Sequence, residues 1–522
     1  MKKILVIIIF LSTLSCKKSV DVLPVFDIPE DQAVKNVSDL EVIVNGAYQS
    51  LQSSNNYGAA YKLIPDIISD HITVNRYANE KGNTGGYLNV HLRQMYGTID
   101  GVWRESYNCI NRCNVVIDAY ENSKVEAVNT ADKLNLARIA GEAYLLRGMM
   151  HFELVRLYGL QYGIGSNADQ SGVILKLKPT TDRPSQKRNT TEEVYVQVVK
   201  DLIIAIELLP ERRRNEDFGT YQGLIGGRAI RVSAQAILAR VYFQKATDDD
   251  DDAFMLLLNS MKDTGVDIGN LITKDKLKDS TGFVPYWSKF GYQVAESTLF
   301  QLVNLLNPVT NEANSSIKTL IDSYFYSGNQ EDAAFPTIYQ LNNNFDVFAK
   351  FSPGDLRKFI VGTVPIVTSS KTIVSFSQKY KINEGTIDLN VPIIRAGELV
   401  LSRAEVHATK GNLSAAIDDI IAIRNRNYVA DGERANLVAL SQTDLLLEIQ
   451  RERSKELFTE GDRLHHFRRF AQRHQIESTK SMRSFTLSAY NSLIPNFRFD
   501  SKSSLFKIPD AEIAANPVVI NN

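Results

Sequence analysis

The sequence lacks an excess of charge of either sign, and it lacks long apolar runs. Its 522 residues include 59 Lys and Arg and 60 Asp and Glu, a formal net charge of −1 at pH 7. Such a chain offers no basic footprint for the phosphates of nucleic acid, and no local Lys/Arg stripe supplies one. No stretch approaches the ~20 apolar residues that a membrane-spanning helix needs. We therefore expect no nucleic-acid partner and no transmembrane helix in a chain whose 44% hydrophobic content is typical of a folded protein with a full core.

Cysteine is scarce: the chain has only Cys16, Cys109 and Cys113. Three cysteines make a poor disulfide framework, which argues against a small scaffold stapled by such bonds. Cys109 and Cys113 lie four residues apart in a segment predicted to be helical, where roughly parallel Cβ vectors are unsuited to a disulfide. Their spacing also differs from the C-x-x-C of zinc and redox sites. We predict that both are buried thiols.

Short catalytic and cofactor motifs are missing as well. The chain contains no G-x-S-x-G, no Walker A sequence and no G-x-G-x-x-G. It therefore offers no nucleophile with a recognisable base and no cofactor fingerprint. We expect a binding protein that is not an enzyme and uses no cofactor.

The first 16 residues have the layout of an export signal. Lys2 and Lys3 precede eight apolar residues (4–11), and small and polar residues lead from there to Cys16. The apolar run is too short to span a bilayer, so residues 1–15 are predicted to be a signal peptide. Cys16 resembles the cysteine of the bacterial lipobox, although Thr13 stands where an aliphatic residue is preferred.

Lipidation of Cys16 would anchor the mature chain to a membrane. A diacylglycerol thioether and further acyl chains contribute about 0.8 kcal/mol per buried methylene, which makes a stable anchor. Residues 16–32 contain Pro24 and Pro29 and are predicted to be the lipidated tether. The alternative is an ordinary signal peptide with an incidental cysteine near its end.

Helical periodicity dominates residues 33–263. Apolar stripes predict one helix around residues 103–117 and a second over 140–158 that ends at Gly159. Thr190, Thr191 and Glu193 have the spacing of a capping box, so a third helix is predicted from there to Leu209, where Pro210 stops it. A fourth is predicted over residues 229–245.

The helical pattern returns in residues 391–522. Residues 392–409 are predicted to form one helix and residues 413–426 its antiparallel partner, with Gly411 in the turn. Ala415 and Ala416 are small enough for two helices to pack closely, as in a tetratricopeptide repeat. Without a strict 34-residue period, we interpret these pairs as degenerate repeats.

Residues 264–390 differ from both flanking regions. They are rich in Asn, Ser, Thr and aromatic residues, and residues 297–302 and 372–377 are strand-like. The predicted fold is therefore mostly α, a tetratricopeptide-like helical repeat scaffold with an irregular insertion of loops and short strands. Loops held on a rigid frame are where binding residues usually lie.

Glu452, Glu456 and Glu460 are spaced to lie on one face of a helix. Two of them could form the acid/base pair of a glycoside hydrolase on a helical scaffold, but side chains that point the same way cannot flank a glycosidic bond. Nearby arginines would also hold these carboxylates ionised. We interpret the cluster as a structural ion-pair network. The arginines considered as its partners are Arg451, Arg453, Arg463, Arg468 and Arg469.

Two further clusters could suggest a metal. His465 and His466 are adjacent on a helix and face about 100° apart, so they cannot readily chelate one ion, and His474 adds no recognised motif. Residues 248–252 are five consecutive aspartates, but an EF-hand needs alternating ligands and a glycine. We predict no metal site, and a solvated turn at residues 248–252 that places negative charge before a helix from about Ala253.

Several short motifs occur in an order that resembles one family, the SusD/RagB family. They begin in the segment from Asp39 to Tyr48 and end near Pro517, and together they extend over nearly all of the mature chain. The matching residues are Asn45, Gly46, Ala47 and Tyr48; Ile67, Ile68, Ser69 and Asp70; Trp103, Tyr107, Ile110, Asn111, Arg112 and Asn114; Glu142, Ala143, Leu146, Arg147, Leu157, Tyr158 and Gly159; Glu193, Tyr195, Asp201, Leu202, Leu209 and Pro210; Arg395, Glu398, Arg403, Ala404 and Glu405; Glu452, Arg453, Glu456, Leu457, Glu460, Gly461 and Arg463; and Ile508, Pro509, Glu512, Asn516 and Pro517.

The resemblance implies a nutrient-uptake lipoprotein of the outer membrane that faces outward. Such a protein sits as a lid on a SusC-like TonB-dependent barrel and captures glycans, or peptides in the RagB branch. Lys17 and Lys18 depart from the acidic residues that often follow the lipidated cysteine in surface-exported relatives. Gly148 replaces the family's usual alanine, and His466 its usual aspartate.

Aromatic residues in two segments are the candidates for ligand contact, since aromatic faces cover the C–H faces of sugar rings. Trp287 lies in the insertion with Tyr286 and Tyr292, and its alternative role is a local core residue; Trp103 is predicted to be core. Members of the family commonly place ligand contacts in loops at this place and near residues 70–93. The candidates in that second segment are Asn75, Arg76, Tyr77, Asn79 and Tyr87.

Overall fold

The computed structural model describes most of the helical scaffold and parts of the insertion. The described residues are 34–69, 72–74, 98–180, 185–211, 227–274, 297–302, 339–341, 355–357, 361–365, 373–377, 379, 391–427, 433–476, 481–482, 497–498 and 505–521. Within these ranges the chain is mostly helical, as predicted. None of the described helices combines the length and the apolar character that a bilayer crossing needs.

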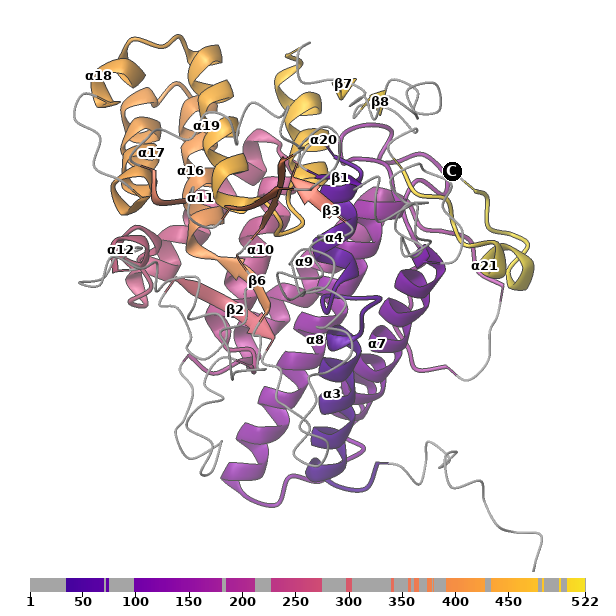
Figure 1. Ribbon diagram of the computed structural model, residues 1–522. Helices are drawn as coiled ribbons and strands as arrows, with labels where there is room; N and C mark the ends of the chain where they lie inside the picture. The colour runs from indigo at the N-terminus through magenta and orange to yellow at the C-terminus, as the bar shows by residue number, and fades with distance from the viewer. Residues whose placement is uncertain are drawn as a thin grey trace, which may run out of the picture.

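The N-terminal half is a set of helices packed around one central helix. Figure 1 shows α3, α7 and α8 side by side in indigo and purple. In α8 nearly every residue from Ile139 to Tyr158 is buried, so this helix is covered on all sides by its neighbours. The helices of this half are α3 (Val37–Gln52), α4 (Ala60–Ile67), α7 (Thr98–Glu121), α8 (Thr130–Tyr158), α9 (Thr191–Leu208), α10 (Arg231–Lys245), α11 (Asp248–Asp263) and α12 (Ile268–Lys274).

The four predicted N-terminal helices are confirmed, and α9 has the end signals predicted for it. Thr190 caps α9: its side chain accepts from the Glu193 backbone N–H, and the Glu193 carboxylate accepts from the Thr190 backbone N–H. The helix ends before Pro210, which cannot continue it. Gly159 follows the last residue of α8 in an extended rather than a left-handed conformation.

The C-terminal end of α8 is buried, and donors from distant segments satisfy its carbonyl groups. Arg468 donates to the carbonyl oxygens of Arg156 and Gly159, and Arg188 donates to that of Tyr158 at 3.1 Å. The backbone N–H of Phe506 donates to Leu157 at 3.1 Å. The last carbonyls of a helix have no partner inside it and carry partial negative charge, so cationic donors are favourable there.

The C-terminal region, from residue 391 on, begins with a strand and continues mainly with helices. Its elements are β6 (Val391–Arg395), α16 (Ala396–Thr409), α17 (Leu413–Asn427), α18 (Glu433–Val438), α19 (Gln442–Leu457), α20 (Arg463–His474) and α21 (Asp510–Ala515). The tetratricopeptide-like pair α16–α17 is confirmed, with Gly411 at φ +79° in the turn. Ala404, Ala408 and Ala416 are fully buried between the paired helices.

Two local predictions were wrong. Residues 392–395 do not begin the helix: they belong to β6, because Val391, Pro392 and Ile394 pair with strand β2 (Thr298–Leu302). The five aspartates are not a solvated turn but the first turn of α11, capped by Thr247. Asp250 and Asp251 are buried there, paired with Lys245 at 2.9 Å and with Arg473 at 2.8 Å.

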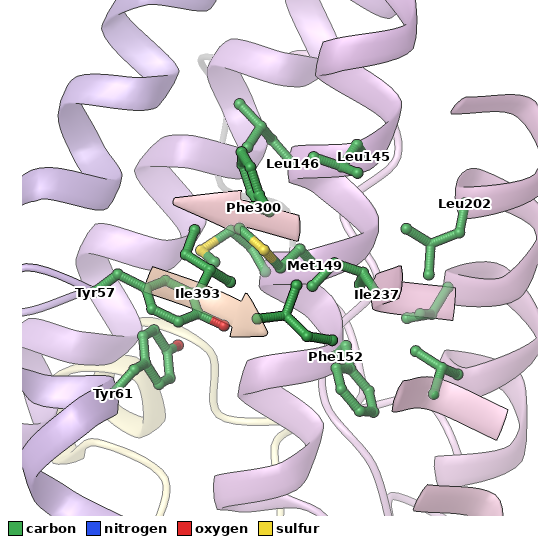
Figure 2. Packing of buried hydrophobic residues seen from close by; sticks show 14 of the residues in the cluster. Tyr57, Tyr61, Leu145, Leu146, Met149, Phe152, Leu202, Ile237, Phe300 and Ile393 are labelled. Atoms are coloured by element: carbon green, nitrogen blue, oxygen red, sulfur yellow. The ribbon is translucent and has the colours of Figure 1, made fainter. Parts of the chain in front are cut away.

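One hydrophobic core extends from α3 to β6 and α16. Figure 2 shows Met149 and Phe152 of α8 close to Ile237 of α10, Phe300 of β2 and Ile393 of β6. Trp103 belongs to this core, as predicted, and its Nε1 donates to Glu512 of α21 at 3.2 Å. Cys109 and Cys113 are buried free thiols, which confirms their prediction. A second, smaller cluster lies among α16, α17, α19 and α20.

Candidate ligand-binding framework

The sequence-predicted contact residues lie outside the described residues, so their roles stay predictions. This applies to Trp287, Tyr286 and Tyr292 in the insertion, and to Asn75, Arg76, Tyr77, Asn79 and Tyr87 in the other segment. Cys16, the signal peptide and the tether also lie outside. The structure does describe the segments from which both candidate regions emerge.

A four-stranded antiparallel sheet joins the two candidate regions. Its strands are β1 (Ile72–Val74), β3 (Tyr339–Leu341), β5 (Ile373–Ser377) and β4 (Val361–Pro365), in the order β1-β3-β5-β4. Strand β1 directly precedes the segment that starts at Asn75, and the other three strands belong to the insertion. Two regions that are about 270 residues apart in sequence therefore meet by backbone pairing, with Ile72 opposite Leu341 and Val74 opposite Tyr339.

The register brings one terminus of each of the four strands to the same end of this sheet. Val74 is opposite Tyr339 in the β1–β3 pair, and Val361 is opposite Ser377 in the β4–β5 pair. Leu341 pairs with Ser375, so Ser377 lies level with Tyr339. Strand β1 therefore ends at the same end of the sheet at which β3 and β4 begin.

Arg357 fixes the chain just before β4 to helix α19. This side chain is fully buried and donates to Glu452 Oε1 at 2.6 Å. It also donates to both carboxylate oxygens of Asp355, at 3.0 and 2.8 Å. Glu452 in turn accepts from Arg424 at 3.0 Å. Buried ion pairs thereby connect the insertion to α17 and α19.

Lys379 fixes the chain just after β5 to the end of the same helix. Its buried ammonium group donates to the carbonyl oxygens of Glu456 and Phe458, at 2.7 and 2.8 Å, and to Glu460 Oε1 at 2.7 Å. It lies 4.1 Å from the centre of the Phe458 ring. An ammonium group has three donors, and all three are used here. The β4–β5 hairpin is therefore anchored on both sides.

The glutamate cluster is a buried ion-pair network, as predicted, but the partners found for it in the described residues are other cations than the five arginines considered. Glu456 accepts from Arg395 at 3.0 Å and from Arg426, and Glu460 accepts from Arg395 at 2.6 and 2.8 Å. Glu460 also lies beyond the end of α19, so only Glu452 and Glu456 share the helix. The arginines considered bind elsewhere: Arg451 to Glu448, Arg453 to Asp462, Arg463 to Ser454, Arg468 to the end of α8, and Arg469 to Glu405.

The pKa values of the glutamates in this cluster are lowered, so their carboxylates stay ionised at neutral pH. Burial alone would raise the pKa of each glutamate, but the arginines outweigh it: Arg357 and Arg424 lower the pKa of Glu452 to about 2, and Arg395 and Lys379 lower that of Glu460 to about 2. A general acid needs a pKa raised towards neutrality. These side chains do not have that property.

Gly461 brings α4 against the turn between α19 and α20. Its backbone has φ +78°, and a Cβ built there would overlap the carbonyl oxygen of Tyr61. The Gly461 N–H donates to the carboxylate of Asp66 at 3.3 Å. Asp66 is fully buried, and burial raises its pKa to about 7. This contact positions α4, the helix that leads to β1.

The described part of the molecule contains a small central cavity and a larger groove. A central cavity of about 20 Å3, lined by Lys62, Arg240, Glu398 and Glu460 among others, has room for about one water molecule. A groove of about 280 Å3 lies between α11, α12, α16 and α17. The groove charges are already paired, Arg403 with Asp419 at 2.6 Å and Lys262 with Asp267 at 3.3 Å. The cavity is too small for a sugar ring, although Tyr57 and Tyr61 are among its lining residues, and no Phe, Trp or Tyr is among the described residues that line the groove.

The histidines are parts of the packing around α20. His474 contacts Glu405 at 2.8 Å, and His466 contacts Arg469 at 3.2 Å. Burial lowers the pKa of His465 well below its usual value, with Arg156 and Arg468 adding to the effect. Across the described ranges, no group of three or more His, Cys, Asp or Glu side chains is arranged to hold a metal ion.

Two models of known protein families match this chain, one in its N-terminal part and one in its C-terminal part. A family model described as "Starch-binding associating with outer membrane" matches residues 21–243, and the model of the SusD family matches residues 358–522. The chain belongs to the SusD/RagB family. The resemblance noted in the sequence is thereby confirmed, and the Glu452–Arg463 block of SusD-like motifs is the part that holds the insertion.

Individual relatives agree with the family. The chain is 23% identical over 255 residues to SusD-like protein P2 of Formosa agariphila, a match that spans 47% of this chain and 45% of that protein. A SusD superfamily protein of Bacteroides thetaiotaomicron has the same fold, with a TM-score of 0.72 at 20% identity over 93% of this chain and 99% of the other. A putative sugar binding protein of Bacteroides vulgatus matches with a TM-score of 0.69 at 21% identity, over 94% of this chain and 99% of that one.

The SusD-like framework also shows what sequence reasoning missed. Arg357 and Lys379 were not candidates, because they lie in an irregular segment and no periodicity marks them. Arg395 carried a signal as part of a family motif. Only the pairing of β6 with β2 shows why it reaches the glutamates, since Arg395 is the last residue of β6.

Proposed function

We propose that this protein is a non-catalytic receptor that captures glycans and delivers them to a SusC-like TonB-dependent barrel of the outer membrane. The observation that carries the proposal is the β1–β3 pairing, which joins the strand before Asn75 to the insertion on one anchored sheet. Family membership supports a glycan, as does similarity in fold to a SusD-like carbohydrate binding protein of Bacteroides vulgatus.

The non-catalytic part of the proposal is supported by the state of the described carboxylates. Glu452, Glu456 and Glu460 are fully ion-paired and lie inside the scaffold, where no sugar could reach them. Glycoside hydrolysis needs one protonated and one ionised carboxyl group on either side of the bond. This network provides only ionised groups on one side.

The membrane part of the proposal rests on the first 16 residues and on the family. Cys16 follows a predicted signal peptide and would carry the lipid that holds the protein at the outer membrane, facing outward. The domain limits proposed are a tether over 16–32, helical regions over 33–263 and 391–522, and the ligand-binding insertion over 264–390.

Affinity electrophoresis tests the ligand assignment. Wild type should be retarded in native gels that contain the polysaccharide it binds, and Trp287→Ala should abolish most of the retardation, since stacking on a sugar ring would be lost. Tyr120→Ala, a half-buried residue of α7, is the matched control and should migrate like wild type. Equal retardation of Trp287→Ala and wild type would remove Trp287 from the site. Retardation in no polysaccharide, together with binding of peptides, would favour a peptide receptor.

Two further experiments address the partner and the anchor. A tagged copy at native expression should co-purify a large β-barrel from detergent-solubilised outer membrane. Recovery of the protein alone would count against a lid. Cys16→Ser should move the protein from the membrane fraction to the soluble fraction, and an unchanged distribution would contradict lipidation at this residue.

A further inference from the structure

We propose that the groove between α11, α12, α16 and α17 is a second binding site, which takes one neutral sugar residue. The groove has a volume of about 280 Å3, close to the lower limit of pockets that bind small molecules. Figure 1 shows α12 beside α16 and α17, and α11 precedes α12 in the chain. None of the residues that line the groove is one of the contacts predicted from the sequence, so this site is separate from the one in the proposed function.

Two ion pairs give the groove a fixed shape. Arg403 of α16 donates to both carboxylate oxygens of Asp419 of α17, from Nη2 at 2.6 Å and from Nε at 3.0 Å. On the opposite wall, Asp267 accepts from the backbone N–H of Gly269 at 3.0 Å and lies 3.3 Å from Lys262 of α11. A ligand that enters such a preformed groove does not have to order the protein around itself.

Four apolar side chains also line the groove. Leu258 of α11 and Ile268 of α12 are buried, and Met255 and Ala415 are half-buried. They provide an apolar surface for the C–H groups of a sugar ring. Because alanine has only a methyl group, position 415 leaves open the space that a longer side chain would fill.

Two polar side chains in the lining have hydrogen-bonding groups to spare. His407 is half-buried and Asn259 is exposed, and neither side chain is hydrogen-bonded in the described part of the chain. Burial lowers the pKa of His407, and Arg403 adds to this effect against the opposite influence of Asp419. The imidazole is therefore neutral at pH 7, with one nitrogen that donates and one that accepts. An amide also does both, which suits hydroxyl groups, since each of these can donate and accept.

The charged side chains of the groove favour a neutral ligand, because their charges are compensated. Arg403 uses both oxygens of Asp419, and Asp418 lies 2.6 Å from Arg434. Lys262 is paired as well. A ligand carboxylate or ammonium group would have to displace one partner of a pair, whereas a hydroxyl group can bond to a paired ion without separating it from its partner. The ligand class is therefore a neutral polyol, and the volume limits it to about one sugar ring.

Saturation-transfer NMR of the full-length protein with D-glucose, D-galactose, D-mannose and D-xylose tests the site. We expect at least one of these sugars to bind with a Kd in the millimolar range, since the groove offers few hydrogen bonds and no aromatic face. Glucuronate and glucosamine, which carry a charge on a similar ring, should bind more weakly. Binding should persist in Trp287→Ala, because this variant changes only the site predicted in the insertion.

Ala415→Leu should abolish the binding, because leucine fills the groove without changing a charge or a hydrogen bond. Ala422→Leu is the matched control, since Ala422 is also a half-buried alanine of α17 but does not line the groove. His407→Ala should raise the Kd roughly twofold to tenfold through the loss of one hydrogen bond. His407→Gln, which keeps a donor and an acceptor, should restore most of the affinity.

The possible results separate this site from the other. Failure of every neutral sugar to bind would overturn the proposal, as would binding that Ala415→Leu leaves unchanged or that Ala422→Leu reduces equally. Loss of binding in Trp287→Ala would assign the signal to the insertion instead. Tighter binding of glucuronate or glucosamine would contradict a neutral ligand. If Ala415→Leu does not fold, His407→Ala and Asn259→Ala replace it, and an unchanged Kd in both would overturn the proposal. The polysaccharide test of the proposed function can fail without affecting any of these results.

Discussion

Gly461 lies directly against the backbone of Tyr61, so that a Cβ at position 461 would overlap the Tyr61 carbonyl oxygen and stand 3.0 Å from Lys62 Cα. The contact joins the turn after α19 to the helix that leads to β1. It also gives a physical reason for the Glu460-Gly461 pair of the family motif: the glutamate bonds the cationic anchors, and the glycine allows α4 to approach. Position 461 is therefore expected to be far less tolerant than other glycine turns.

Gly461→Ala should destabilise the protein by roughly 2–5 kcal/mol, the sum of about 1–2 kcal/mol for a left-handed backbone and about 1–3 kcal/mol for overpacking. Gly411→Ala is the matched control, because Gly411 has nearly the same φ of +79° but no atom within 4 Å of the added Cβ. It should cost only the backbone term. Urea denaturation of both variants measures the difference, and equal costs would contradict the contact.

Glu456→Gln should lower the free energy of unfolding by about 3–5 kcal/mol, since removing one member of a buried pair leaves the others without compensation. Glu456 is fully buried and bonds Arg395 and Arg426. Asp418→Asn, at an exposed pair with Arg434, is the control and should cost about 0–1 kcal/mol. Similar losses of unfolding free energy in both variants would contradict a stabilising role for the buried network.

Asp66→Asn should change the pH dependence of stability between about pH 4 and pH 7. Burial raises the pKa of Asp66 from 3.8 to about 7, so in this window the folded state binds a proton that the unfolded state does not. Protonation therefore stabilises wild type as pH falls through 7, and a wild type at pH 8 carries a buried charge that the variant lacks. The stability of the variant relative to wild type should fall between pH 8 and pH 5.

The control for this titration is Glu193→Gln. Its hydrogen bond from the Thr190 backbone N–H lowers the pKa of Glu193 below 4.5, so its effect on stability is complete above that pH. Relative to wild type, this variant should show a constant difference from pH 5 to pH 8. Parallel curves for Asp66→Asn and wild type would show that Asp66 does not titrate in this range.

Arg468→Met should destabilise the protein by about 1–3 kcal/mol, because the carbonyls of Arg156 and Gly159 would lose a buried donor at the end of α8. Arg451→Met provides the comparison, since Arg451 is exposed on α19 and paired only with Glu448 in the described residues. Its cost should stay within about 1 kcal/mol. Thermal unfolding monitored by circular dichroism distinguishes the two cases.

The fold was predictable where the signals are local. The Thr190–Glu193 capping box, the Gly411 turn and the apolar stripe around Trp103 each depend on residues a few positions apart, and each is present as predicted. The start of the helix at Pro392 was wrong because the strand there depends on β2, about 90 residues earlier in the chain. No local pattern records such a partner.

The candidate site was predictable only in part for the same reason. The glutamate spacing indicated an ion-pair network, but two of its cations, Arg357 and Lys379, come from an irregular segment and meet α19 only in the folded chain. The aspartates at 248–252 look solvated in the sequence, but Asp251 is buried and paired because Arg473 of α20 packs beside it. The periodicity of apolar residues does not show which distant side chains will pair in the folded protein.

Calorimetric titration of the full-length protein in detergent with a panel of oligosaccharides and peptides tests the central claim, that this chain is a glycan receptor and not an enzyme. The account predicts saturable binding of at least one oligosaccharide class, no binding of the peptides, and no new reducing ends after prolonged incubation. Binding of peptides alone, or release of reducing ends from any glycan, would contradict it.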